Sequence, residues 1–82
     1  MKTLEELNEF GKRYYGDRFL GCEVVFKRDV PSALECRIDT DVASYALEPL
    51  LEEIGSKIDD IERDVAEKRG AGRVLDIVIK RV

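Results

Sequence analysis

Residues 47–70 read LEPLLEEIGSKIDDIERDVAEKRG, and this stretch decides the fold. Its apolar residues recur at alternating steps of four and three, which is the period of one face of an α-helix. Acidic residues fill most of the remaining circumference, as on a helix with one side on a core and the others in water. The apolar stripe consists of Leu47, Leu51, Ile54, Ile58, Ile61 and Val65. The pattern predicts a long helix that ends at Gly70.

Two residues interrupt this predicted helix. Pro49 is favourable in the first turn of a helix but costs about 3 kcal/mol in its interior. Gly55 is a second weak point, with a cost of up to about 1 kcal/mol relative to alanine. Either residues 42–47 form a separate turn and the main helix begins near Pro49, or the helix is kinked there.

A strand is expected directly after the helix. Residues 73–82 are rich in β-branched side chains, which favour extended structure. Because side chains alternate between the two faces of a strand, Leu75, Ile77 and Ile79 are expected to face the helices. The side chains expected on the opposite, outer face are Val74, Asp76, Val78, Lys80 and Val82.

A β-hairpin is expected before the long helix. Residues 22–27 and 34–39 both alternate between apolar and polar side chains, and the turn between them contains Pro31. Residues opposite each other in an antiparallel pair lie on one face, which favours Val24 or Phe26 opposite Cys36. Cys22 and Cys36 then share the core face as diagonal neighbours at best.

The first fifteen residues predict an amphipathic helix. Thr3 to Glu6 has the T-x-x-E form of a capping box, in which each of the two side chains satisfies an amide of the first turn. Apolar residues then follow at helical spacing, and Gly16 is a natural stop. They are Leu4, Leu7, Phe10 and Tyr14.

These elements predict an α+β two-layer sandwich in the order αββαβ, formed by a single domain over residues 1–82. The crossover through the long helix should return the last strand parallel to the second. We expect the last strand beside the first, so that the sheet order is 2-1-3 and the helices cover one face. The expected core is Leu4, Leu7, Phe10, Tyr14, Val24, Phe26, Leu34, Ile38, Leu51, Ile54, Ile58, Ile61, Ile77 and Ile79.

Charge is distributed unevenly along the chain, whose net charge is −4. Residues 1–34 are neutral, residues 35–67 carry eleven acids against three bases, and residues 68–82 carry five bases against one acid. The acidic average disfavours a dedicated duplex nucleic-acid binder, which needs cations along the phosphates. The segment 35–67 suits a different function, that of an acidic mimic of nucleic acid that blocks a partner.

The amino-acid composition of the chain disfavours catalysis and metal binding. The chain has no histidine, which removes Ser-His, Cys-His and histidine-ligated metal arrangements. Cys22 and Cys36 are expected to be packing residues, and zinc would need two further soft ligands. Asp60 and Asp64 share a helix face but lack the loop of oxygen ligands that calcium requires. We therefore expect no enzyme activity, cofactor or metal.

The order helix, strand, strand, broken helix, strand is similar to the connectivity of type II KH domains. In that family a GxxG loop between two helices grips a single-stranded nucleic-acid backbone. The matching stretch here, residues 53–58, keeps Gly55 and Lys57 but lacks the second glycine. The resemblance implies an alternative function as a single-strand binder. Its expected phosphate contacts are Lys57, Lys68, Arg69 and Arg73.

The outer sheet face is the leading candidate for a binding surface. Valines there would meet water among charged residues, as at an interface with an apolar centre and a charged rim. The last strand also lies at a sheet edge, where a second copy can pair with it. We therefore expect a cytoplasmic protein-binding module, self-associating as a homodimer, with no membrane partner. The expected interface residues are Val25, Val74, Val78, Val82, Arg37 and Lys80.

Overall fold

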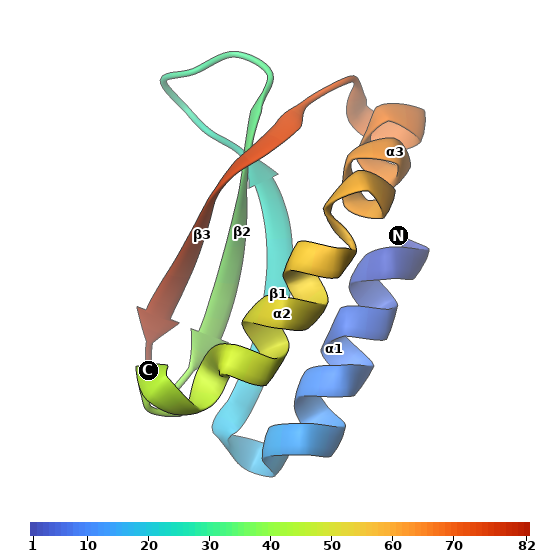
Figure 1. Ribbon diagram of the computed structural model, residues 1–82. Helices are drawn as coiled ribbons and strands as arrows, with labels where there is room; N and C mark the ends of the chain where they lie inside the picture. Colours follow the sequence, from blue (N-terminus) through green and yellow to red (C-terminus); the bar gives the residue numbers. More distant parts are fainter.

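A computed structural model describes all residues, 1–82, and contains three α-helices and a three-stranded mixed sheet (Figure 1). The elements in chain order are α1 (Lys2–Tyr15), the 3₁₀ turn η1 (Gly16–Arg18), β1 (Phe19–Phe26), β2 (Ala33–Thr40), the 3₁₀ turn η2 (Ser44–Leu47), α2 (Glu48–Ser56), α3 (Ile58–Arg69) and β3 (Arg73–Arg81). Figure 1 shows the three helices on one side of the sheet, with β3 farthest from α1. None of the helices is long and apolar enough to span a membrane.

The long predicted helix is two helices. Pro49 lies in the first turn of α2, where its missing amide costs nothing, so the main helical segment begins there as expected. The break lies two residues after Gly55, at Lys57, which separates α2 from α3. The apolar stripe continues across this break, because Ile54 on α2 and Ile61 on α3 are both fully buried.

Helix α1 lies directly against β1. Gly11 makes this close approach possible, since a Cβ atom at this position would lie 2.6 Å from the ring of Phe19. Helix α1 ends at Tyr15, and Gly16 directly after it adopts a positive φ of 67° that few other residues tolerate. The predicted capping box is wrong, because the helix already begins at Lys2 and Thr3 makes no side-chain cap.

Strands β1 and β2 form the predicted antiparallel hairpin. Val24 is opposite Cys36 and Cys22 is opposite Ile38, so one of the two expected registers is confirmed. The alternation of apolar residues leaves only registers that differ by two residues, so it narrowed the pairing to two registers, of which the fold adopts one.

The predicted sheet order 2-1-3 is wrong, because β3 pairs with β2 and the order is β1-β2-β3. The expected orientation is correct, since β3 runs parallel to β2. The physical reason lies in β1, whose outer edge is occupied by side chains from α1 and α3, as described below. Only the free edge of β2 therefore accepts the third strand.

The core lies between the sheet and the helices. It is formed by Leu7, Phe19, Cys22, Val24, Leu34, Cys36, Ile38, Val42, Leu47, Leu50, Ile54, Ile61 and Val65. Three residues that we expected in the core are exposed instead, namely Tyr14, Phe26 and Ile77. Ile77 does share the inner face with Cys36, but it lies on the edge strand farthest from the helices (Figure 1).

Candidate functional site

The outer sheet face has a charged centre. Strand β2 is the middle strand, and its outward side chains Glu35, Arg37 and Asp39 form a row between Val25 on β1 and Val78 on β3. Arg37 Nε lies 2.6 Å from Glu35 Oε2. This ionic row separates the two valines, so the face does not have the apolar centre that the order 2-1-3 implied.

The predicted interface residues divide into three groups. Val25, Val78, Arg37 and Lys80 share the outer face, by their register with the outward residues of neighbouring strands. Val82 is exposed after the end of β3. Val74 was expected on the outer face but is opposite Leu34 and packs against the core.

A β-bulge explains why Val74 lies on the inner face. The register between β2 and β3 shifts by one residue between Leu34 and Glu35, which leaves Leu75 without a partner. The alternation of inward and outward side chains along β3 is therefore interrupted at Leu75, which we had assigned to the inner face. The side chain of Leu75 is 61% exposed.

The outer edge of β1 is closed by two side chains. The Asn8 amide on α1 donates to the carbonyl of Cys22 at 3.0 Å and accepts from the Cys22 amide at 2.9 Å. Arg69 at the end of α3 donates to the carbonyl of Val24 at 2.9 Å. Cys22 and Val24 are two residues apart, so these groups point to the same side of the strand. Three of the main-chain groups that another strand would use are therefore satisfied.

The outer edge of β3 has no comparable cover. Near its beginning, the Val74 amide donates to Glu62 Oε2 at 2.7 Å. Near its end, the Arg81 guanidinium turns away to the carbonyl of Val42 and the hydroxyl of Ser44. From Asp76 to Lys80 no side chain of the protein hydrogen-bonds to the main-chain groups of this edge. These N–H and C=O groups can therefore pair with another strand.

Of the predicted phosphate contacts, Lys57 lies at the opposite end of α3 from Lys68 and Arg69. Lys57 lies between α2 and α3 with its Nζ 3.9 Å from Glu6, and Lys68 lies about 16 Å farther along α3, at 1.5 Å per residue. Arg69 is engaged with β1, and Arg73 Nε lies 3.4 Å from Glu62. Three of the four cations therefore already contact groups of the protein.

The two cysteines are buried free thiols whose Sγ atoms lie 3.4 Å apart. They are diagonal neighbours on the inner face, as the sequence predicted. Their hydrogen bond and the burial around them raise the pKa of the Cys22 thiol above its ordinary value. A raised pKa keeps this thiol protonated at neutral pH and therefore weakly nucleophilic.

One residue of the acidic helix face joins two helices. Asp64 on α3 accepts a hydrogen bond from the Thr3 amide at 3.1 Å, so the unpaired amide end of α1 is capped by a residue 61 positions away. Hydrogen bonds from the Thr3 hydroxyl and amide hold the pKa of Asp64 below its ordinary value. Asp64 therefore stays ionised and stabilises the positive end of the α1 dipole.

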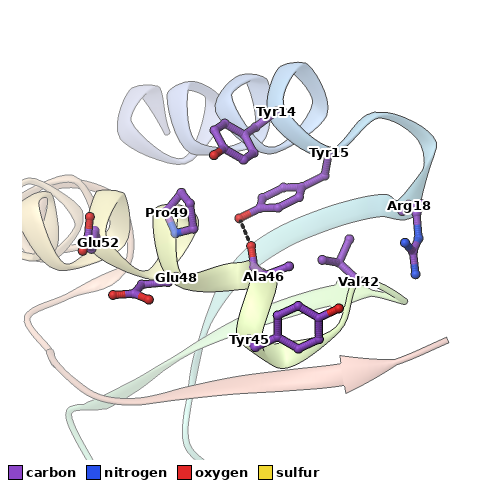
Figure 2. Close-up of a pocket in the computed structure, with 9 residues that line it drawn as sticks. All are labelled: Tyr14, Tyr15, Arg18, Val42, Tyr45, Ala46, Glu48, Pro49 and Glu52. Carbon is purple, nitrogen blue, oxygen red and sulfur yellow. Dashed lines mark hydrogen bonds between the residues drawn. The ribbon is translucent and has the colours of Figure 1, made fainter.

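A cleft of about 630 Å³ lies between the C-terminal end of α1 and the segment η2–α2 (Figure 2). All three tyrosines of the chain, Tyr14, Tyr15 and Tyr45, line it, although no sequence pattern links residues 14 and 45. The Tyr15 hydroxyl donates to the carbonyl of Ala46 at 2.8 Å, which holds the two segments together. Burial raises the pKa of the Tyr15 phenol above its ordinary value.

Comparison with family models, with curated proteins and with solved structures gave no match to this chain.

Proposed function

We propose that this domain is a non-enzymatic protein-binding module that pairs with a second copy of itself through the free edge of β3. The observation that carries the proposal is the difference between the two edges of the sheet. Asn8 and Arg69 close the edge at β1, whereas β3 has no such cover between Asp76 and Lys80. An open edge of this length is a template for another strand.

The sequence of β3 complements itself in an antiparallel pairing. A two-fold axis through Val78 brings Asp76 of one copy opposite Lys80 of the other, twice, and Ile77 opposite Ile79, twice. The paired residues belong to the same face, because Asp76 and Lys80 are outward and the isoleucines are inward. A closed two-fold dimer needs this kind of self-complementary surface.

Burial supports the same pairing. Ile77 is 39% exposed on β3, the edge strand farthest from α1, and a second β3 would cover the inner side of this edge. In this proposal the domain acts as a two-layer sandwich whose sheet becomes continuous over six strands. A domain of 82 residues buries a limited fraction of its own surface, so an added interface contributes to its stability.

Sedimentation over a wide range of protein concentration tests the proposal. Wild type is expected to dimerise, and Ile77→Lys is expected to be monomeric because each copy would bury a lysine cation opposite the apolar Ile79 of the other. Leu20→Lys is the matched control, because Leu20 is 54% exposed on the opposite edge strand. A wild type that is monomeric at every concentration would overturn the proposal.

A charge exchange tests the register. Asp76→Lys places lysine opposite Lys80 in both halves of the dimer and should weaken association at least about fivefold, the effect of roughly 1 kcal/mol. The double variant Asp76→Lys, Lys80→Asp restores opposite charges and should restore association. Both variants lose the ion pair between Lys27 and Asp76 within one chain. Recovery of association in the double variant would therefore report on the contact between the two copies.

A KH-like single-strand binder remains a second proposal, favoured by one observation. The α2–α3 break at Lys57 lies in the stretch where that family places its loop. Retention of single-stranded RNA at low salt would support this function, with loss expected in a Lys57→Glu, Lys68→Glu variant. An absence of retention at low salt would exclude it.

A further inference from the structure

The cleft between α1 and η2–α2 presents open aromatic faces. Tyr14 is 60% exposed and Tyr45 is 88% exposed, from opposite sides of the cleft (Figure 2). Pro49 on α2 adds a further apolar surface to the wall of the cleft (Figure 2). Large apolar faces that lie exposed along one cleft are typical of a binding surface.

The aromatic side chains are held in place. The Tyr14 ring stacks on Phe10 with ring centres 5.6 Å apart, and its centre lies 4.9 Å from that of Tyr15. Tyr15 in turn is fixed by its hydrogen bond to the carbonyl of Ala46. A ligand would therefore meet a wall that is already ordered, which reduces the entropy lost on binding.

The charge of the cleft is negative. Glu48 and Glu52 line it, and neither forms an ion pair within the protein. Their spacing of four residues on α2 puts both carboxylates on one helix face, where they repel each other. Arg18 also lines the cleft, but its Nε lies 3.0 Å from Asp41 Oδ1, which balances its charge.

The cations around the cleft do not neutralise its carboxylates. Arg13 borders Tyr14 on the side of Phe10, outside the cleft. Arg81 is bound to Val42 and Ser44 beneath η2. The cleft therefore combines tyrosine faces with two carboxylates that form no ion pair within the protein.

We propose that this cleft binds the side chain of an arginine on a partner protein. A guanidinium is planar and stacks on an aromatic face, while its N–H groups donate to carboxylates in a paired geometry. Charge complementarity selects this partner, because Glu48 and Glu52 repel an anion and gain nothing from a purely apolar one. The cleft contains no residue of β3, so the proposal does not depend on self-association.

Tyrosine fluorescence provides a direct test. The chain has three tyrosines and no tryptophan, so its intrinsic fluorescence reports on this cleft alone. The probe is a short glycine-serine peptide with one central arginine, and the matched peptides carry lysine or the neutral isostere citrulline. We expect a saturable change with arginine at a roughly millimolar Kd, a weaker one with lysine and none with citrulline.

Three variants distinguish binding of the arginine peptide in this cleft from non-specific electrostatic attraction of the peptide to an acidic protein. Tyr45→Ala and Glu52→Gln should each weaken binding of the arginine peptide by about fivefold. Glu67→Gln removes the same charge from an exposed position on α3 and should change nothing. The proposal is overturned if Glu52→Gln and Glu67→Gln act equally or if arginine gives no saturable change.

A second copy of the chain is the competing occupant. If it filled the cleft, tyrosine fluorescence would change with protein concentration in the absence of peptide. The arginine peptide would then have to compete with self-association. That result would overturn the proposal, whereas fluorescence per molecule that is independent of concentration supports it.

Discussion

The two edges of the sheet differ although their strands are similar in length and apolar content. At β1, a side-chain amide from α1 and a guanidinium from α3 satisfy three main-chain groups. At β3, which lies farthest from α1 (Figure 1), the helices supply only Glu62, which binds the Val74 amide, and the main chain from Asp76 to Lys80 has no side-chain partner. The comparison teaches that an edge strand is closed by particular side chains on neighbouring elements, not by its own sequence.

Hydrogen exchange should show the largest difference between the edges. In dilute solution we expect the Cys22 amide, held by Asn8, to exchange about a hundredfold more slowly than the edge-facing amides in residues 76–80. This factor corresponds to about 2.8 kcal/mol of local opening free energy. At high concentration, pairing of β3 should slow every second amide in 76–80, and equal exchange at both edges would break the comparison.

Opening the β1 edge should have the next largest effect. Asn8→Ala removes both hydrogen bonds to Cys22 and leaves its partly buried amide and carbonyl without partners. We expect a loss of about 2 kcal/mol in the free energy of unfolding, measured with urea. Glu9→Ala, an exposed neighbour on α1, is the control and should change stability by less than about 0.5 kcal/mol.

Arg69 should make a smaller contribution than Asn8. Arg69→Ala removes one hydrogen bond, to the carbonyl of Val24, and should cost about 1 kcal/mol in urea unfolding. Lys68→Ala makes the same change of charge at the adjacent exposed residue and should cost almost nothing. Equal losses in the two variants would mean that charge, and not closure of the edge, determines the effect.

The smallest effect on stability is expected from pH, which acts through the contact between Asp64 on α3 and Thr3 at the start of α1. The folded pKa of Asp64 is depressed, so its contribution to stability is present above its ordinary pKa and is lost as pH falls through the folded value. Asp64→Asn should therefore flatten part of the acid side of the stability profile. Asp59→Asn, also on α3 but without contact to Thr3, should leave the profile unchanged, and identical profiles for both variants would contradict this role.

Sequence reasoning located the periodic elements and missed the contacts between them. Pro49 and Gly55 correctly indicated a helical segment that begins late and is interrupted, since both act on the local backbone. The bulge at Leu75 was not visible, because it depends on the register with β2, and it moved Val74 to the inner face. The alternation of apolar and polar residues along each strand narrowed the register of the hairpin, because this alternation is a local property of the sequence.

The candidate sites were predicted less well than the elements. Val25 and Val78 lie on the outer face as expected, but the order of the strands placed a charged row between them. Arg69 was expected to contact phosphate and instead binds the edge of β1. Polar side chains such as Arg69 have no period of their own, so their partners follow only from the assembled fold.

The sequence by itself determined the helices, the hairpin, the parity of its register and the parallel direction of the last strand. These features follow from side-chain periodicity and from backbone limits at proline and glycine. Only the tertiary structure decided which edge of the hairpin accepts β3, because Asn8 and Arg69 occupy the other edge from distant positions in the chain. It also brought Tyr14 and Tyr45 to one cleft, since packing joins residues that no local pattern relates.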